Sequence, residues 1–249
     1  MSDALSAAGA ARRALDLVLE TDAPALRAIL PPSFADAAER YVALLLEANA
    51  KVNLTRIVDP DGVARLHLLD SLSVLPLLDE LAPVRALDLG SGGGVPGIVL
   101  AIARPGVTWT LVDSVRRKAD AMRGFVDALA LTNVSVVAER AETVGRDAAH
   151  REQFDLVTAR ACAPLPVLAE YALPLVRVGG ALVAWKGPID DNEVRAGRAA
   201  ATELGGLVEI LPTGISALGD HQFVLIRKGA TTPDRYPRRP GMPAKRPLG

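Results

Sequence analysis

The sequence predicts an α/β protein in which a seven-stranded, Rossmann-like sheet follows an N-terminal helical extension. From Val84 onward, short apolar runs alternate with stretches of helical periodicity, a pattern typical of a largely parallel sheet. The first apolar run leads into LDLGSGGGVPGI at 87–98, where closely spaced glycines would let a strand turn tightly into a helix. Half of the 249 residues are hydrophobic, so the chain can bury a sizeable core.

Residues 1–82 are expected to form the helical extension. Apolar residues recur at helical spacing over 34–53, where Ser33 is placed to cap the first turn, and again over 62–78. Pro83 marks the start of the second unit, 83–229, which carries the sheet. Its expected strands are 84–90, 107–114, 133–139, 154–160, 179–187, 206–212 and 221–229. Its expected helices are 95–105, 116–131, 165–176 and 191–204.

Residues 230–249 form a basic, proline-rich tail. The stretch from Arg227 to Gly249 contains seven basic residues and one acidic residue, although the whole chain has a net charge of −1. This asymmetry indicates either a polyanionic partner for the tail or a solvated end without a partner. If the tail grips a polyanion, truncation after Lys228 should weaken substrate binding and leave cofactor binding intact.

Composition excludes several classes of protein. No apolar run approaches the roughly 20 residues of a membrane span, and the N-terminal residues lack the apolar core of a signal peptide. The single cysteine, Cys162, cannot form an internal disulfide and is expected to pack as a small core residue. With only three histidines in addition, a metal site is not expected. We therefore expect a cytoplasmic, metal-free monomer.

The glycine-rich turn is compatible with two classes of cofactor. One reading is the dinucleotide fingerprint G-x-G-x-x-G, and the other is the G-x-G-x-G that follows an acidic residue in S-adenosylmethionine (AdoMet) enzymes. The first is formed by Gly92, Gly94 and Gly97, and the second by Gly90, Gly92 and Gly94 behind Asp88. Asp113 ends the second expected strand, 19 residues after Gly94, where either cofactor needs a carboxylate for its ribose. These residues alone do not decide between the cofactors.

Three further features favour AdoMet. In a dinucleotide site the Asp88 carboxylate would face a pyrophosphate, which is unfavourable. Glu142 follows the third expected strand, near where an adenine would lie, and the Gly179-Gly180 turn before the fifth strand is typical of AdoMet-dependent methyltransferases. The sequence therefore predicts a class I AdoMet-dependent methyltransferase sheet, with Asp88, Gly92 and Asp113 in the cofactor site.

Several motifs are more specific than the glycine turn. They are NLTRI at 53–57, HLLDSL at 67–72, GSGGGVPGI at 90–98, WKG at 185–187 and YPRRPGMPAKRPL at 236–248. In these motifs the chain resembles the glucose-inhibited division protein B family, bacterial methyltransferases that modify N7 of a guanine in 16S ribosomal RNA. The resemblance implies AdoMet as the cofactor and 16S rRNA or the small ribosomal subunit as the partner. It also implies cofactor contacts from Gly90, Val95, Ala141, Glu142 and Arg160.

Methylation of guanine N7 needs no general base, because N7 carries a lone pair and no proton. We therefore expect no catalytic acid or base, and catalysis by alignment of the reacting atoms. The expected RNA contacts are Arg116, Lys118, Lys186, Arg238 and Arg239. Arg160 has an alternative role as a partner of Asp155, while His67 and Asp70, three apart on one helix face, are expected to brace the glycine turn.

Other functions remain open at this point. The first is an AdoMet-dependent methyltransferase that acts on a small molecule or a protein, for which the basic tail would be incidental. The second is a non-catalytic nucleotide-binding protein, and the third is a dehydrogenase. Methyl transfer without RNA would indicate the first, absence of turnover the second, and binding of NAD the third.

Overall fold

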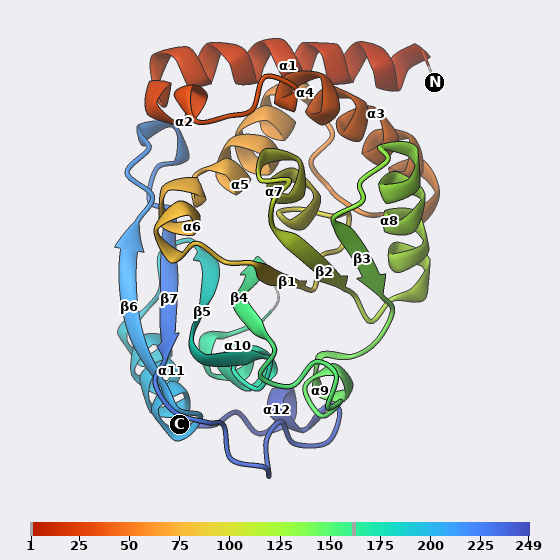
Figure 1. Cartoon of the computed structure of the whole chain (residues 1–249). Helices are drawn as coiled ribbons and strands as arrows, with labels where there is room; N and C mark the ends of the chain where they lie inside the picture. The colour runs from red at the N-terminus through yellow and green to blue at the C-terminus, as the bar shows by residue number, and fades with distance from the viewer. Residues whose placement is uncertain (1, 161–162) are drawn as a thin grey trace.

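The computed structural model describes residues 2–160 and 163–249, so Cys162 lies outside the described residues. Its centre is a seven-stranded sheet with the order β3-β2-β1-β4-β5-β7-β6 (Figure 1). Strand β7 runs antiparallel to β5 and β6, and the other neighbouring pairs are parallel. The strands are β1 Arg85–Leu89, β2 Thr108–Val112, β3 Val134–Val137, β4 Phe154–Arg160, β5 Val176–Lys186, β6 Gly206–Pro212 and β7 Gln222–Lys228. Each falls within, or overlaps, a strand predicted from the sequence.

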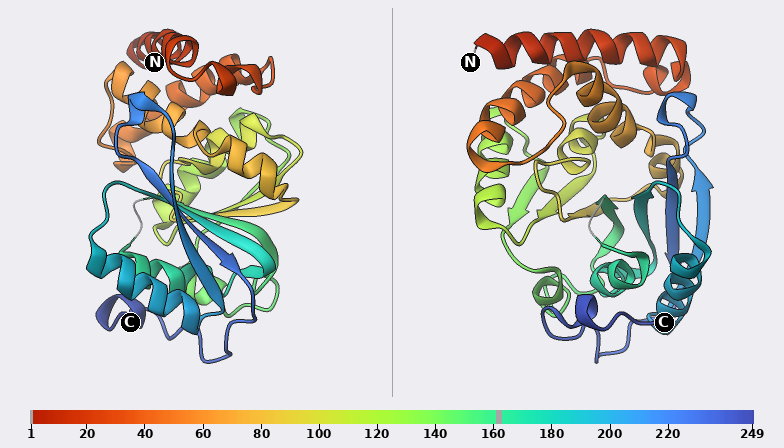
Figure 2. Two further views of the ribbon diagram at one scale, coloured as in Figure 1. Left: turned by 90° about the vertical axis from the view of Figure 1, so that its left-hand side faces the viewer. Right: turned by 180° about the vertical axis from the view of Figure 1, so that it is seen from behind.

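Helices cover both faces of the sheet (Figure 2). The N-terminal helices are α1 Ser2–Thr21, α2 Pro24–Ala28, α3 Phe34–Val52, α4 Pro60–Gly62, the π-helix η1 Val63–Leu69, α5 Asp70–Leu72 and α6 Leu75–Leu81. Those that follow are α7 Gly97–Ala103, α8 Arg116–Ala128, α9 Ala141–Val144, α10 Leu165–Ala172, α11 Asp191–Glu203, the 3-10 helix η2 Ser216–Leu218 and α12 Met242–Lys245. Within the described residues, none of these helices has the length and apolar character needed to cross a membrane.

The two faces of the sheet carry separate hydrophobic cores because side chains alternate along each strand. On β5, Ala181, Val183 and Trp185 pack with α7, α8 and the N-terminal helices. The intervening Leu182 and Ala184 pack with α10 and α11. Neighbouring side chains of one apolar strand therefore belong to different cores.

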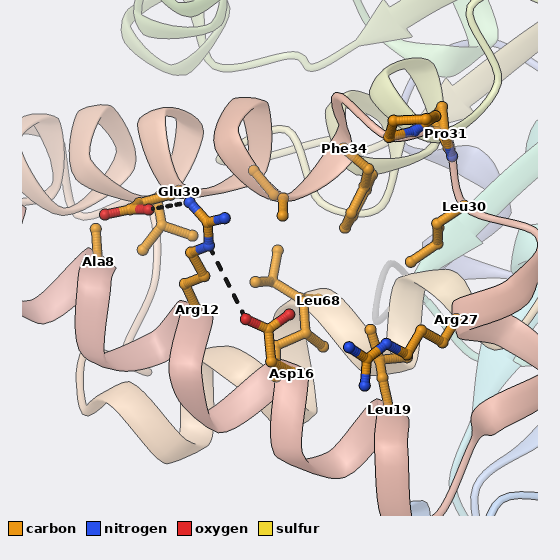
Figure 3. Close-up of a pocket in the computed structure, with 15 residues that line it drawn as sticks. Ala8, Arg12, Asp16, Leu19, Arg27, Leu30, Pro31, Phe34, Glu39 and Leu68 are labelled. Atoms are coloured by element: carbon orange, nitrogen blue, oxygen red, sulfur yellow. Dashed lines mark hydrogen bonds and ion pairs between the residues drawn. The ribbon is translucent and has the colours of Figure 1, made fainter.

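The N-terminal helices begin and end differently from the prediction. The side chain of Ser33 makes no cap hydrogen bond to α3. The second helical stretch starts at Pro60 rather than 62, because the Asp59 carboxylate accepts a hydrogen bond from Gly62 N–H at 2.7 Å. Helix α1 lies across α3 and η1, and a cavity of about 230 Å³ separates these helices (Figure 3). Arg12 spans it from α1, with 2.9 Å between its guanidinium and the Glu39 carboxylate.

The segment that precedes β5 also differs from the prediction. The helix expected over 165–176 ends at Ala172, and β5 starts already at Val176. Gly179 and Gly180, expected as a turn at the start of the strand 179–187, therefore lie within β5. A Cβ on Gly180 would lie 2.6 Å from the Asp155 carbonyl oxygen, and the β4–β5 register shifts at this point. Glycine is needed here because the two backbones approach so closely.

The C-terminal tail folds back against the body and is not a solvated arm. Figure 1 shows it running past α9 and α10, with α12 beside them. Tyr236 is buried, and Arg151 donates hydrogen bonds to the carbonyl oxygens of Thr232 and Tyr236 at 2.8 and 2.7 Å. The Lys228 ammonium is buried, and its nitrogen lies 2.7 Å from a carboxylate oxygen of Glu152. The tail is thus attached where it begins and along its course.

Candidate cofactor and substrate site

A cleft of about 220 Å³ opens at the carboxyl ends of β1 and β2. Parallel sheets of this kind bind ligands at this edge. Its lining residues are Leu89, Gly90, Val112, Asp113, Ser114, Glu139, Arg140, Ala141, Glu142 and Tyr171. Four of them, Gly90, Asp113, Ala141 and Glu142, were predicted as cofactor contacts.

The turn that follows β1 depends on its glycines. Gly90 has a φ of 72°, in the left-handed region where a side chain would be strained. A Cβ on Gly97 would lie 2.3 Å from Leu111 Cδ2, so α7 packs directly on β2 only because this residue is glycine. On α3, Tyr41 donates a hydrogen bond to the Gly93 carbonyl oxygen at 2.8 Å and fixes the turn from the other side. The sequence pattern and the local geometry therefore agree.

Asp88 orders this turn and does not line the cleft, so its prediction as a cofactor contact is corrected. Its side chain is fully buried. One carboxylate oxygen accepts a hydrogen bond from the Thr158 hydroxyl at 2.8 Å, and the other accepts one from Gly97 N–H at 3.2 Å. Burial raises the pKa of Asp88. The carboxylate points beneath the turn toward the N-terminus of α7, where a ligand has no access.

Asp113 joins the turns that follow β1 and β2. Its two carboxylate oxygens accept hydrogen bonds from Gly92 N–H at 2.9 Å and from Val115 N–H at 2.8 Å. Each oxygen still has a lone pair available for a ribose hydroxyl. Gly92 itself does not line the cleft, and it contributes by fixing Asp113 in place.

Glu142 is positioned by the C-terminal tail. It lies in the short helix α9, is 3% exposed, and accepts a hydrogen bond from Gly241 N–H at 2.8 Å. Tyr171 of α10 forms another part of the wall, and burial, with the nearby charges of Glu142 and Glu170, raises its pKa. Sequence analysis missed Tyr171 and this role of the tail, because no local pattern relates Gly241 to a residue 99 positions earlier.

The charge of the cleft distinguishes between the two cofactor classes. Three carboxylates, from Asp113, Glu139 and Glu142, line it together with one guanidinium, from Arg140. Such a lining repels a pyrophosphate but suits AdoMet, whose sulfonium and ammonium groups are cationic and whose ribose offers hydroxyl donors. The residues present therefore fit AdoMet and do not fit a dinucleotide.

A second cleft, of about 420 Å³, lies at the carboxyl ends of β4 and β5. It is lined by Ile57, Leu66, Asp70, Arg160, Trp185, Lys186, Gly187 and His221. Arg160 was predicted as a cofactor contact, but it lines this cleft instead of the first. Val95 lines neither cleft and is 9% exposed.

Hydrogen bonds connect the polar residues of the second cleft. The Asp70 carboxylate lies 3.1 Å from the Arg160 guanidinium and 2.9 Å from His221 Nδ1. His67 Nδ1 is 3.3 Å from Arg160, and its Nε2 is 2.8 Å from the Thr55 hydroxyl. His67 and Asp70 thus hold Arg160 rather than the glycine turn. The alternative partner of Arg160, Asp155, instead accepts hydrogen bonds from Arg177 and two backbone amides.

Among the polar residues that line this cleft, sequence analysis missed His221. His221 precedes β7 and is 151 positions away from its partner Asp70, so no motif connects the two.

Burial and the positive charge of Arg160 lower the pKa of His67 to about 4. His67 is therefore neutral at pH 7, with a lone pair on Nδ1 for Arg160 and a proton on Nε2 for Thr55.

The predicted RNA contacts divide into exposed and internally paired side chains. Arg116 and Arg239 are exposed, and Lys118 is half-buried. The Lys186 ammonium is 2.7 Å from the Glu193 carboxylate and 3.0 Å from the Ala163 carbonyl oxygen. Arg238 binds the fully buried carboxylate of Glu170. The charges of Lys186 and Arg238 are thus paired inside the protein, and their contacts with RNA stay predictions.

Comparison with known proteins gives consistent matches. A family model described as rRNA small subunit methyltransferase G matches residues 35–218. A protein of Deinococcus radiodurans, named ribosomal RNA small subunit methyltransferase G, is 44% identical over 211 residues, covering 84% of this chain and 83% of its own. A protein of the same name from Roseiflexus sp. is 46% identical over 210 residues, covering 84% and 89%.

Solved structures resemble the fold at low sequence identity. A putative O-methyltransferase from Klebsiella pneumoniae has a TM-score of 0.53 and 16% identity, covering 85% of this chain and 97% of its own. An O-methyltransferase from Bacillus cereus, solved in complex with SAH, has a TM-score of 0.52 and 20% identity, covering 74% and 89%. These matches support the Rossmann-like methyltransferase fold that the sequence predicted.

Proposed function

Because the chain belongs to the rRNA small subunit methyltransferase G family, we propose that it transfers a methyl group from AdoMet to N7 of a guanine in 16S rRNA. The observation that carries the proposal is the acidic cleft at β1 and β2, which fits AdoMet within a chain of this family. Since the substrate is ribosomal, the activity belongs in the cytoplasm.

The residues of the first cleft bind and orient the cofactor. Asp113 accepts hydrogen bonds from the ribose, and Ala141 and Glu142 border the adenine. Gly90, which has no side chain, leaves room for the ligand beside the turn. AdoMet supplies the activated methyl group. The protein's own task is to hold N7, the methyl carbon and sulfur in line, where orientation can contribute on the order of 7–11 kcal/mol.

The exposed cations are proposed to bind RNA phosphates. Arg116 and Arg117 lie at the N-terminus of α8, and Arg239, Lys245 and Arg246 lie on the tail, all of them exposed. Such contacts position RNA without reading its sequence, so binding should weaken steeply as the salt concentration rises.

The test uses small ribosomal subunits from cells that lack this protein. Subunits and naked 16S rRNA are incubated with purified protein and methyl-labelled AdoMet, then cleaved chemically at 7-methylguanosine. One new cleavage site is the expected result, and the better substrate form shows whether ribosomal proteins shape recognition. Bound AdoMet without label in either RNA would refute the proposal and favour a small-molecule or protein substrate.

A further inference from the structure

The two clefts open at the carboxyl ends of neighbouring strands. Strand β4, which ends at Arg160, is the hydrogen-bonded neighbour of β1. A base in the second cleft and a methyl donor at β1 would therefore share the same edge of the sheet, at the carboxyl ends of neighbouring strands. Ile57, Leu66 and Trp185 give this cleft apolar walls, and Leu66 is 39% exposed although it is a large hydrophobic residue. Apolar walls with a few polar groups are what a purine base requires.

We infer that the second cleft receives the target guanine and that His221 Nε2 accepts a hydrogen bond from the Watson–Crick edge of that base. This inference rests on the proposed function and adds the group that recognises the base. This contact is additional to the in-line positioning of N7, the methyl carbon and sulfur. It is made by a residue that lies outside the sequence motifs.

The geometry around Asp70 fixes the tautomer of His221. Nδ1 lies 2.9 Å from a carboxylate oxygen that is itself paired with Arg160, so Nδ1 carries a proton and donates it. In the neutral imidazole, Nε2 then has a lone pair. The Asp70 side chain is 4% exposed and that of His221 is 37% exposed, so the ring extends from the buried carboxylate toward the cleft. Within the described part of the chain, Nε2 has no hydrogen-bond partner.

An acceptor at this place selects guanine over adenine. Guanine presents adjacent N1–H and N2–H donors on its Watson–Crick edge, whereas adenine presents a lone pair at N1 and a donor only at N6. Facing Nε2, the adenine lone pair would be left unpaired and repelled. The edge that carries N7 is then directed away from His221 and remains available to the donor.

The same contact strengthens during the reaction. The N7 lone pair forms the new N–C bond, and the electron pair of the C–S bond passes to sulfur, which leaves a neutral thioether and a cationic purine. The positive charge makes N1–H a stronger donor, so the hydrogen bond to Nε2 is stronger in the transition state than in the ground state. N1 keeps its proton throughout, so His221 acts as a hydrogen-bond acceptor and not as a base.

Substitution of His221 by asparagine or glutamine tests the roles of the two ring nitrogens one at a time. His221→Asn keeps a donor near the Nδ1 position for Asp70 and removes the group at Nε2, whereas His221→Gln places an amide near the Nε2 position. On small ribosomal subunits that lack the methyl group, we expect His221→Asn to lower kcat about 10- to 100-fold. His221→Gln should recover part of this loss, and the AdoMet Kd from calorimetry should change less than about twofold in both variants.

His150 provides a matched control. Its Nδ1 also contacts a carboxylate, that of Asp147 at 2.6 Å, but it does not line the second cleft. His150→Asn should therefore leave kcat unchanged. A wild-type kcat in His221→Asn, or an equal loss of AdoMet affinity in both His221 variants, overturns the inference. Absence of methyl transfer by the wild-type protein overturns the proposed function and this inference together.

Discussion

Replacing Arg238 by alanine should destabilise the protein and weaken AdoMet binding. Both Glu170 carboxylate oxygens accept hydrogen bonds from Arg238 Nε, at 2.9 and 3.1 Å, and Glu170 is fully buried. In the variant, the backbone N–H of residue 238, at 2.8 Å, remains as a donor to this carboxylate. Breaking a buried ion pair costs roughly 3–5 kcal/mol, and we expect about 3 because one donor remains and the Arg238 side chain is 24% exposed.

The loss should be visible both in unfolding and in binding. For a chain of this size, about 3 kcal/mol lowers Tm by about 6–12 °C, measured by circular dichroism. Three residues after Arg238, Gly241 donates the hydrogen bond that positions Glu142 in the cofactor cleft. If a loosened tail loses this hydrogen bond to a charged group, the AdoMet Kd should rise about tenfold in calorimetry.

The adjacent Arg239 is the matched control, since it is exposed and differs by one position. Arg239→Ala should leave Tm and the AdoMet Kd unchanged and weaken only RNA binding. If Arg238→Ala keeps the Tm and AdoMet Kd of the wild type but loses RNA affinity, the tail is an RNA-binding arm and our reasoning is wrong.

Three further predictions follow from individual contacts. Asp113→Ala should raise the AdoMet Kd at least about tenfold while circular dichroism shows the sheet retained; an unchanged Kd would exclude the ribose contact. Arg116→Ala should reduce the slope of log K for RNA against log salt by about 1, and an unchanged slope would place the phosphates elsewhere. Because burial, assisted by Arg160, lowers the pKa of His67 from 6.5 to about 4, the unfolded chain binds a proton more readily between these pH values. The contribution of His67 to the free energy of unfolding therefore falls by up to about 3 kcal/mol as the pH falls through that range. His67→Gln should remove that loss in urea unfolding at pH 7 and pH 4.5, and equal losses in both proteins would contradict the assigned pKa.

The parts predicted from sequence are those that local physics determines. Short apolar runs mark the central strands because these are buried on both faces, and the glycines of the first turn are required by φ and by close packing. Asp113 could be predicted because it directly follows the apolar run that forms β2. Asp88 was correctly placed just before the glycine turn, but spacing did not reveal that its carboxylate points inward, toward Gly97 and Thr158.

The parts not predicted depend on contacts between distant residues. Arg238 and Glu170 are 68 positions apart, and the charge count that revealed a basic tail contains no information on the carboxylate that neutralises it. Lys186 is paired as well, but with a residue only seven positions away, Glu193 on α11, which spacing alone did not mark as its partner. A count of positive charges overstates the RNA-binding surface wherever those charges are paired inside the protein.

Residues from opposite ends of the chain hold side chains of the two clefts in place. Residues of the N-terminal extension, His67 and Asp70, hold Arg160 in the second cleft. The C-terminal tail holds Glu142 in the first cleft through Gly241. Both braces lie outside the strand-and-helix unit 83–229, although that unit carries the sheet. The boundaries predicted from the sequence thus separate patterns of residues, whereas each site depends on residues from two of the resulting segments. A fragment limited to 83–229 is therefore expected to lack the groups that position both the cofactor and the base, even where its strands still pair.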